Sequence, residues 1–357
     1  MEQNLNEKET TAETNRCPGC GSNMEFNITS GNLRCGHCGT TQDFDQEGEV
    51  VRRKMCDEIV KGHQQWTESA VFRCDGCGAK SVIDRKEIAK PCCWCGSPHV
   101  VSTEELPGIK PDSVIPFQVT TETARNSFFK WIKRKFFAPN TLKRLDNKNE
   151  FMNQMYSSSW SYSANTVSNY SGTLGRRVAV TRTVNGQTQT TWVTRWFNVN
   201  GVLQQPYKDF IVPSCVQIPP RFFDRIKPFN LTLLKVYRQE FLSGIVAEHY
   251  SRCIQTCFTD FSNFVRRDLT NKVMRLHNAD SVSRLNLNTI YNDKHFNYIL
   301  LPVYVANYKY KNKRYNFYVN GASGKVAGAY PKSVWKILFS LTGVGLIILG
   351  IAHLFSK

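Results

Sequence analysis

The chain has 357 residues, of which 41% are hydrophobic and 12% aromatic, and its formal net charge is +17. This length and composition exclude general disorder and predict two or three folding units with at least one buried core. Residues 1–15 carry four glutamates and one lysine without an apolar stretch, so no secretory signal is expected. In a reducing cytosol, the 13 cysteines favour metal binding over disulfides.

The charge is divided unevenly along the chain. Residues 1–101 hold 12 Lys/Arg against 15 Asp/Glu, a balance of −3, whereas residues 102–336 hold 33 against 14, a balance of +19. A zinc ion with four thiolates carries about −2, so two filled sites would take the N-terminal part to roughly −7. We therefore expect the metal sites and the basic surface on different parts of the molecule.

The first 101 residues divide into four segments. Residues 1–15 are predicted to be a disordered acidic tail. Two cysteine-rich blocks follow, at 16–42 and 70–101. Between them, residues 43–69 have apolar side chains at helical spacing, which predicts a short helical connector.

The cysteines of the two blocks repeat one pattern. In each block a CxxC pair is followed by 14 residues and a second CxxC pair, and the second block is the first displaced by 57 positions. Four thiolates suit tetrahedral zinc and leave no position open for water or substrate, so we predict two structural zinc ribbons with one ion each. The predicted ligands are Cys17, Cys20, Cys35 and Cys38 at site 1, and Cys74, Cys77, Cys92 and Cys95 at site 2.

Two groups of cysteines leave alternatives open. At site 2, Cys92 and Cys93 compete for one ligand position, and Cys92 keeps the two-residue spacing to Cys95. Cys253 and Cys257 lie one helical turn apart and could share a metal. No second pair accompanies them, which favours core packing for both.

Residues 102–332 are predicted to form an α+β domain with antiparallel strands. Thr120 or Thr121 could cap a helix that runs to about Phe137. The turn signal Asn185-Gly186 lies between β-rich runs and predicts a hairpin. Further expected elements are one long helix and two strands, at about 231–275, 296–310 and 313–319.

The segment 333–357 contains an apolar stretch from Ile337 to Phe355 without a charged side chain. Its 19 residues can cross a hydrocarbon core of about 30 Å, and Trp335 precedes it as interfacial residues do. The stretch predicts a C-terminal transmembrane anchor, with a buried helix as the alternative. The Lys/Arg excess before it predicts a single-pass membrane protein with its N-terminus in the cytoplasm.

The stretch from Phe128 to Arg144 interleaves basic and aromatic residues and contains no acid. We favour an amphipathic helix that packs its aromatic side chains into the domain under a solvated basic face. Contact with anionic lipid and binding of nucleic acid are the alternatives.

Several motifs carry a resemblance to a known family. They are CPGCG with CGHCG, CDGCG with CCWCGS, the stretch from Pro116 to Lys143, RQEFLSGIVAEHY at 238–250, and HFNYILLPVYVANYKYKNKRYNFYVNGASGKVAG at 295–328. At these residues the chain resembles bacterial TFIIB-type zinc-ribbon membrane proteins, often labelled as primosomal or replication-restart-helicase-like. The resemblance covers most of the chain. Some relatives are similar to membrane partners of phage-shock and flotillin-like stress proteins, which implies a scaffold at the inner membrane.

The sequence contains no P-loop, GxSxG or histidine-based metal motif, so we expect no enzyme. The leading hypothesis is a tail-anchored membrane adaptor that presents two structural zinc ribbons to cytoplasmic protein partners. Contact of the basic region 102–336 with anionic lipid is a further expectation. The alternative is a nucleic-acid-binding accessory protein of DNA replication, which ranks lower because the ribbons are not the basic part.

Overall fold

The structure is a computed structural model, and some residues within its strands and its last helix are described by their backbone alone. It describes residues 16–55, 69–74, 77–84, 92–95, 100–104, 110–143, 152–184, 187–310 and 313–355. The acidic tail predicted at 1–15 lies outside these residues.

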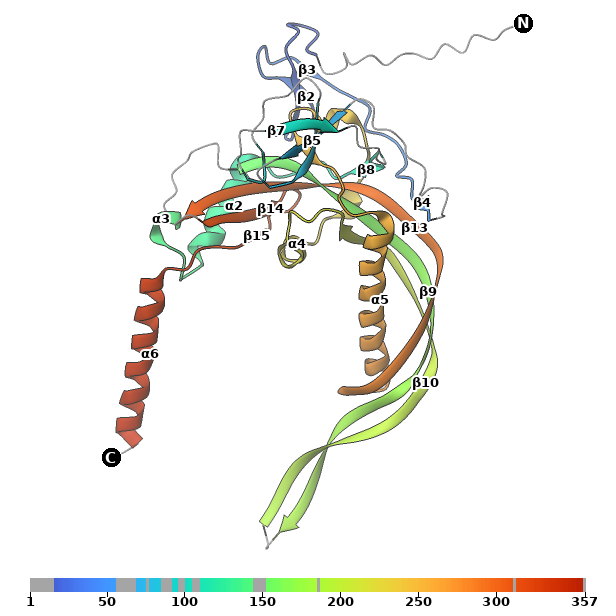
Figure 1. Cartoon of the computed structure of the whole chain (residues 1–357), viewed down its shortest axis with the longest axis vertical. Coiled ribbons are helices and arrows are strands. Elements are labelled where there is room, and N and C mark those ends of the chain that lie inside the picture. Colours follow the sequence, from blue (N-terminus) through green and yellow to red (C-terminus); the bar gives the residue numbers. More distant parts are fainter. Residues whose placement is uncertain are drawn as a thin grey trace, which may run out of the picture.

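Three long antiparallel strands form the centre of the molecule. Strand β9 (Met152–Val184) pairs with β13 (Ser281–Tyr310) along one edge and with β10 (Gln187–Pro213) along the other. The predicted hairpin is therefore confirmed, since Gln187 pairs with Val184 on either side of the turn. Figure 1 shows the three strands curving together, with helix α5 (Ile254–Leu276) inside the curve.

Shorter strands extend this sheet on both sides. Among the described residues its main path runs β11-β8-β13-β9-β12-β6-β5-β7, with β10, β14, β15 and β4 attached beside it. Most neighbours are antiparallel, but β12 with β9 and β8 with β13 are parallel pairs. The mixed α+β class predicted from the sequence is thus confirmed. The shorter strands are β4 (Arg53–Lys54), β5 (Ser69–Cys74), β6 (Lys80–Asp84), β7 (Val100–Glu104), β8 (Ser113–Val114), β11 (Lys235–Val236), β12 (Val246–Glu248), β14 (Lys313–Asn320) and β15 (Val326–Gly328).

Helix α5 covers the inner face of the long strands with one apolar stripe. Its buried residues recur every three or four positions, as a helix packed on one side requires, and they are Ile254, Cys257, Phe261, Val265, Leu269 and Val273. Phe261 stacks on Tyr162 of β9 with ring centroids 5.7 Å apart. Phe264 stacks on Phe210 of β10 at 4.1 Å. Aromatic contacts therefore fix α5 to both strands.

Helix α2 (Thr121–Lys133) begins where the sequence predicts. The side chain of Thr120 caps it by accepting a hydrogen bond from the Thr123 amide. Phe128 and Ile132 are buried, while Lys130 and Lys133 are exposed. The packed amphipathic helix preferred from the sequence is thus what the structure shows, although α2 ends four residues before Phe137.

Two predicted helices differ from the structure. The helix expected at 231–275 forms only from Ile254, because the residues before it make short 3-10 turns, η2 (Leu231–Leu233) and η3 (Gln239–Leu242), and strands β11 and β12. The described part of the connector, up to residue 55, is not helical but contributes β4, which gains backbone pairing with His295 and Phe296 of β13. The rest of the connector lies outside the described residues.

The C-terminal helix α6 (Val334–Phe355) requires a correction. Across the residues that the structure describes, no helix is long and apolar enough to cross a membrane. In α6, Lys336 is hydrogen-bonded to Ala138 and Asn140 of the domain, and Ser340 and Thr342 interrupt the described apolar side chains. By this finding the predicted single-pass localisation in the inner membrane is wrong, and the transmembrane anchor at 333–357 has no support.

The contact between α5 and the sheet generates a stability prediction. We expect Phe261→Ala to lower the free energy of unfolding by about 3–5 kcal/mol, because the fully buried ring contacts both β9 and β10. Ile290→Ala, on the exposed face of β13, is the matched control and should change it by less than about 0.5 kcal/mol. Urea unfolding followed by circular dichroism measures both, and equal effects would contradict the assigned packing.

Candidate metal centres

At site 1, the structure brings together the four predicted sulfurs. Cys17, Cys20, Cys35 and Cys38 place their Sγ atoms within 4.8 Å of one another. Sγ of Cys17 lies 3.3 Å from that of Cys38, and Sγ of Cys20 lies 3.5 Å from that of Cys35. Four sulfurs at 2.3 Å from a tetrahedral zinc are about 3.8 Å apart, so these spacings suit a shared metal. They are far too long for a disulfide of about 2.05 Å.

Site 2 has the same arrangement. Cys74, Cys77, Cys92 and Cys95 also gather their Sγ atoms within 4.8 Å. The separation is 3.5 Å between Cys74 and Cys95 and 3.7 Å between Cys77 and Cys92. Each group could therefore hold one metal ion, and the all-thiolate donor set suits zinc.

Tight glycine turns position the first cysteine of each pair whose following glycine the structure describes. The amides of Gly21, Gly39 and Gly78 donate to the carbonyls of Cys17, Cys35 and Cys74, at 2.9, 3.0 and 2.7 Å. All three glycines have φ between +71° and +77°, a conformation that a side chain disfavours. The repeat in the sequence is thus a repeat of backbone geometry.

Hydrogen bonds favour the thiolate form at one cysteine of each site. The side chain and amide of Ser22 lower the pKa of Cys20 to about 5. The neighbouring thiol of Cys93 lowers the pKa of Cys92 to about 4. A second cysteine of each site shifts the other way: the pKa of Cys35 is raised to about 11, and burial raises the pKa of Cys77 above its usual range. Since thiolates are the form that binds metals, a bound cation has to displace the proton at these two positions.

Site 1 lies on a small sheet of its own, formed by β1 (Met24–Asn27), β2 (Asn32–Cys35) and β3 (Thr41–Gln42). This ribbon docks on the scaffold through Phe241, whose ring lies 5.3 Å from Phe26 and 5.0 Å from Phe44. The Phe26 amide also donates to the Ser243 carbonyl at 3.1 Å. Phe241 is not a metal-ligand residue and lies far from the cysteines in the sequence. Sequence analysis therefore could not predict that it holds the first ribbon in place.

Site 2, in contrast, is part of the main sheet. Strand β6 pairs with β12, so that Val82 lies opposite Ala247 and Ser81 opposite Glu248. Trp94, between two of the cysteines, is buried with its ring 6.4 Å from that of Tyr318. The boundary predicted between residues 101 and 102 falls inside β7. The second ribbon and the α+β domain therefore share one core.

The structure also separates Cys92 from Cys93. Cys92 belongs to the group of four sulfurs, whereas Cys93 does not. Cys93 is buried in the shared core, and its carbonyl accepts a hydrogen bond from Nδ2 of Asn307 at 3.0 Å. The ligand position therefore belongs to Cys92, in agreement with its two-residue spacing to Cys95.

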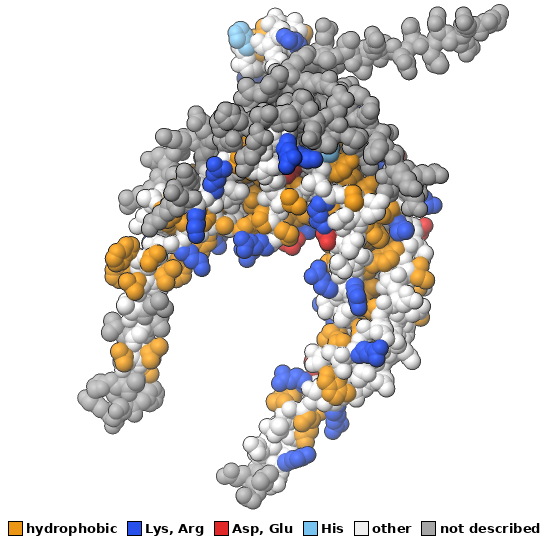
Figure 2. All heavy atoms as spheres, viewed as in Figure 1, with side chains coloured by type: hydrophobic (Ala, Val, Ile, Leu, Met, Phe, Trp, Pro, Cys, Tyr) orange, Lys and Arg blue, Asp and Glu red, His pale blue; other side chains and the backbone are white. Residues whose placement is uncertain are grey.

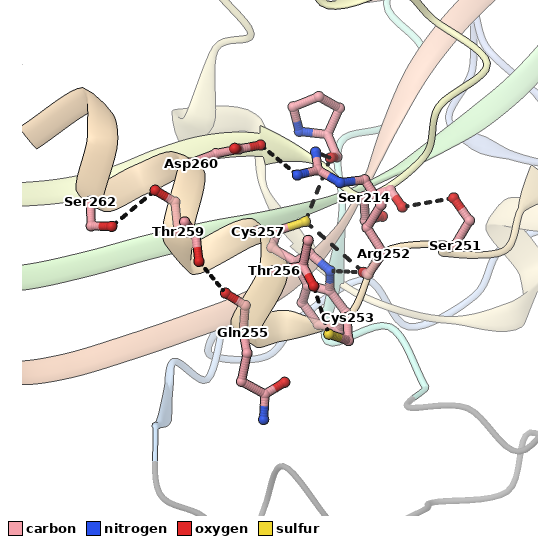
Figure 3. Close-up of polar contacts among 12 residues, drawn as sticks. Ser214, Ser251, Arg252, Cys253, Gln255, Thr256, Cys257, Thr259, Asp260 and Ser262 are labelled. Carbon is pink, nitrogen blue, oxygen red and sulfur yellow. Dashed lines mark hydrogen bonds and ion pairs between the residues drawn. The ribbon is translucent and has the colours of Figure 1, made fainter.

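Cys253 and Cys257 lie at the start of α5, and Figure 3 shows them on different sides of that helix turn. Cys257 is fully buried, as core packing predicts, but Cys253 is exposed at the N-cap with its Sγ 3.1 Å from Oγ1 of Thr256. That hydrogen bond lowers the pKa of Cys253. Among the described residues no third ligand joins them, so they do not form a metal group.

Comparison with known proteins finds a relative that matches along most of the chain. The chain is 25% identical over 343 residues to a protein of Bacillus subtilis (strain 168) named "Uncharacterized protein YdjG", which covers 92% of this chain and 93% of that protein. No protein-family model and no solved structure matches the chain. The relative's name assigns no activity, so the functional argument rests on the sites themselves.

The sites generate a prediction about metal content. Purified protein should carry two zinc ions per chain by elemental analysis, and Cys17→Ser and Cys74→Ser should each lose one. Cys74→Ser should lower the melting temperature of the whole domain more than Cys17→Ser does, because site 2 shares the main core.

Cys93→Ser is the matched control for this experiment, since it changes the neighbouring thiol. It should retain both ions, whereas Cys92→Ser should retain one. Two ions in Cys92→Ser would show that the ligand assignment at site 2 is incorrect.

The carboxyl group of Glu248 generates a second prediction here. It is buried beside Ser157, whose Oγ donates to Oε2 at 3.2 Å, and desolvation raises its pKa from 4.5 to about 8. Between these values the folded chain keeps a proton that the unfolded chain releases. The free energy of unfolding should therefore fall as pH rises from 4.5 to about 8 and then level off.

Glu248→Gln removes this titration and keeps a neutral side chain of the same shape. The variant should match the natural chain near pH 4.5 and exceed it in stability above pH 8, as measured by urea unfolding with the metal bound. Glu47→Gln, on the surface, should leave the pH profile unchanged. If the free energies of unfolding of Glu248→Gln and the natural chain change in parallel with pH, the assignment of a neutral carboxyl group to buried Glu248 is incorrect.

Proposed function

We propose that this chain is a non-enzymatic adaptor in which two structural zinc ions hold two ribbons on one β scaffold. The observation that carries the proposal is the closure of both sites: each has four sulfurs within bonding reach of a single ion. A tetrahedral zinc with four thiolates has no open position for a substrate, so its contribution is to the fold. On this proposal the chain is also a member of the zinc-ribbon family that its motifs resemble.

The exposed parts of the first ribbon support a binding role. Cys20, Cys38 and the intervening His37 are exposed, while Cys17 and Cys35 are buried beneath them. Metal ligation on one side and the Phe241 contact on the other leave this turn little conformational freedom. A rigid, exposed loop loses little entropy when it binds, which suits recognition of a protein partner.

The rival enzymatic function lacks a site in the described residues. The buried group of Glu248, Ser157 and Cys215 is closed to solvent, and its carboxyl hydrogen-bonds to Ser157 rather than activating a nucleophile near the surface. The features that favour nucleic-acid binding lie elsewhere in the molecule, on the part of the long strands that is distant from the two zinc ribbons.

A site-specific crosslinking experiment tests the adaptor proposal. A photoreactive amino acid at His37, on the exposed turn of site 1, should give a discrete protein adduct in extracts of cells that express the full chain. The adduct should disappear in the Cys17→Ser background, because the loop loses its metal-held geometry.

The same photoreactive group at Gln255, exposed at the start of α5, is the matched control. It should not yield that adduct. Failure of position 37 to crosslink while zinc is bound, or identical adducts from both positions, would contradict the proposed role of the ribbon.

A further inference from the structure

The long strands continue past the domain as an arm. We define the arm as the described residues 169–184 of β9, 187–204 of β10 and 281–292 of β13. Pairing with β13 ends where Ser281 lies opposite Gly175. The part of the arm beyond Gly175 is therefore a two-stranded hairpin ribbon of β9 and β10 alone. The projecting ribbon is visible at the bottom of Figure 1.

The two faces of the arm differ. Tyr170, Leu174 and Val199 point toward α5 and form a small core with Val273. Side chains alternate between faces along a strand, so the residues between these lie on the opposite, outer face. The described outer-face residues that are exposed include Arg177, Trp192, Trp196, Asn198, Asn200, Arg284, Asn286 and Asn288.

Two tryptophans and one arginine form the centre of this outer face. Trp192 and Trp196 are 62% and 53% exposed, and they lie on the same strand four residues apart, or about 13 Å. Arg177 lies on the neighbouring strand opposite Thr194, midway between them. A basic residue therefore lies on the same face as the two exposed tryptophans, one strand away and level with the gap between them.

Trp196 is held in place by the glycine opposite it. Gly175 pairs with Trp196, and a Cβ there would lie 2.7 Å from Cζ3 of the indole ring. The ring thus lies against the bare backbone of β9 and presents its other side to solvent. Aromatic residues that cover a cross-strand glycine are a known stabilising arrangement in sheets.

The arm is positively charged. Its described residues include five arginines and no Asp or Glu. Arg176 donates to the carbonyls of His277 and Asn278 at the end of α5, whereas Arg177, Arg182, Arg195 and Arg284 are exposed and form no ion pair with a described residue. Asp280 adjoins the arm, and its carboxylate accepts a hydrogen bond from the backbone amide of Arg177 at 2.8 Å. Figure 2 shows the basic and hydrophobic side chains interspersed along the ribbon.

We propose that the outer face of the arm binds single-stranded nucleic acid, with bases stacked on Trp192 and Trp196 and the phosphate backbone near Arg177 and Arg284. Exposed aromatic rings on an open sheet with cations between them fit unpaired bases and phosphates together. The exposed asparagines on the same face offer both donors and acceptors to base edges.

The two-stranded ribbon also argues against a bilayer as the occupant. Its outer backbone N–H and C=O groups beyond Gly175 have no strand partner among the described residues, and hydrocarbon could not satisfy them. A second copy of the arm would carry the same positive charge, which disfavours face-to-face pairing.

Fluorescence anisotropy of the full chain with a labelled 20-nucleotide oligothymidine tests the proposal. Binding should weaken as salt rises, and Arg177→Ala with Arg284→Ala should reduce the slope of log K against log salt by about 1.4, at about 0.7 per phosphate contact. Trp192→Ala should weaken binding about tenfold or more, while Trp192→Phe should restore most of the affinity because stacking survives.

Trp335→Ala is the matched control, since Trp335 is 70% exposed and belongs to α6, which lies away from the arm (Figure 1). It should bind as the natural chain does. Equal melting temperatures of the natural chain and Trp192→Ala show that the variant is folded. The proposal is overturned by absence of binding, by equal binding of Trp192→Ala, by equal binding of a 20-base-pair duplex, or by tighter binding of the chain to anionic phosphatidylserine vesicles.

Discussion

The antiparallel pairing of β9 with β13 is the contact that places every other part of the molecule. It runs from Met152 opposite Ala306 to Gly175 opposite Ser281. Near one end, β12 and β14 attach and lead to site 2 and to α2. Beyond the other end, β9 pairs with β10 alone and forms the tip of the arm. The metal sites and the arm are therefore held apart by the length of two strands rather than by a linker.

Residue alternation along β9 explains how two layers pack on this pairing. Tyr156, Trp160 and Tyr162 face α5 and the aromatic cluster around it, with Trp160 donating to the Arg252 carbonyl at 3.1 Å and Tyr162 to that of Ile254 at 2.7 Å. Between them, small buried serines face the other side, where the core of site 2 and Glu248 lie. Large side chains on one face and small ones on the other let a helix and a metal ribbon approach the same strand.

Local signals in the sequence predicted several features because their causes are local. The CxxC spacing brings both sulfurs of a pair to one turn, Thr120 caps α2 through an amide three residues away, and Asn185-Gly186 joins two strands that pair directly. These contacts involve residues close in the chain, so their geometry follows from residue type and spacing.

The remaining features depend on contacts between distant residues. The apolar pattern before Ile254 predicts a helix. In the structure, however, Val246, Ala247 and Glu248 form a strand that pairs with β9 and β6. The basic pair Arg53 and Lys54 pairs with β13, and Arg53 reaches Asp112 at 2.6 Å. The apolar length of the last segment, together with Trp335 and the Lys/Arg excess before it, also led to the membrane localisation that α6 does not support. None of these outcomes is encoded within a window of a few residues.

The different settings of the two ribbons have a consequence for the order in which the chain acquires its metals during synthesis. Strands β1 to β3 and all four sulfurs of site 1 lie within residues 16–42, so this ribbon can close on its ion as soon as it leaves the ribosome. Strand β6 of site 2 pairs locally with β5, but its other partner, β12, lies more than 160 residues later. The second set of thiols can therefore gather early, but the shared core that packs around them is complete only when most of the protein has been made. During that interval these thiols lack the packing of the folded domain, which leaves them more open to oxidation or to the wrong metal.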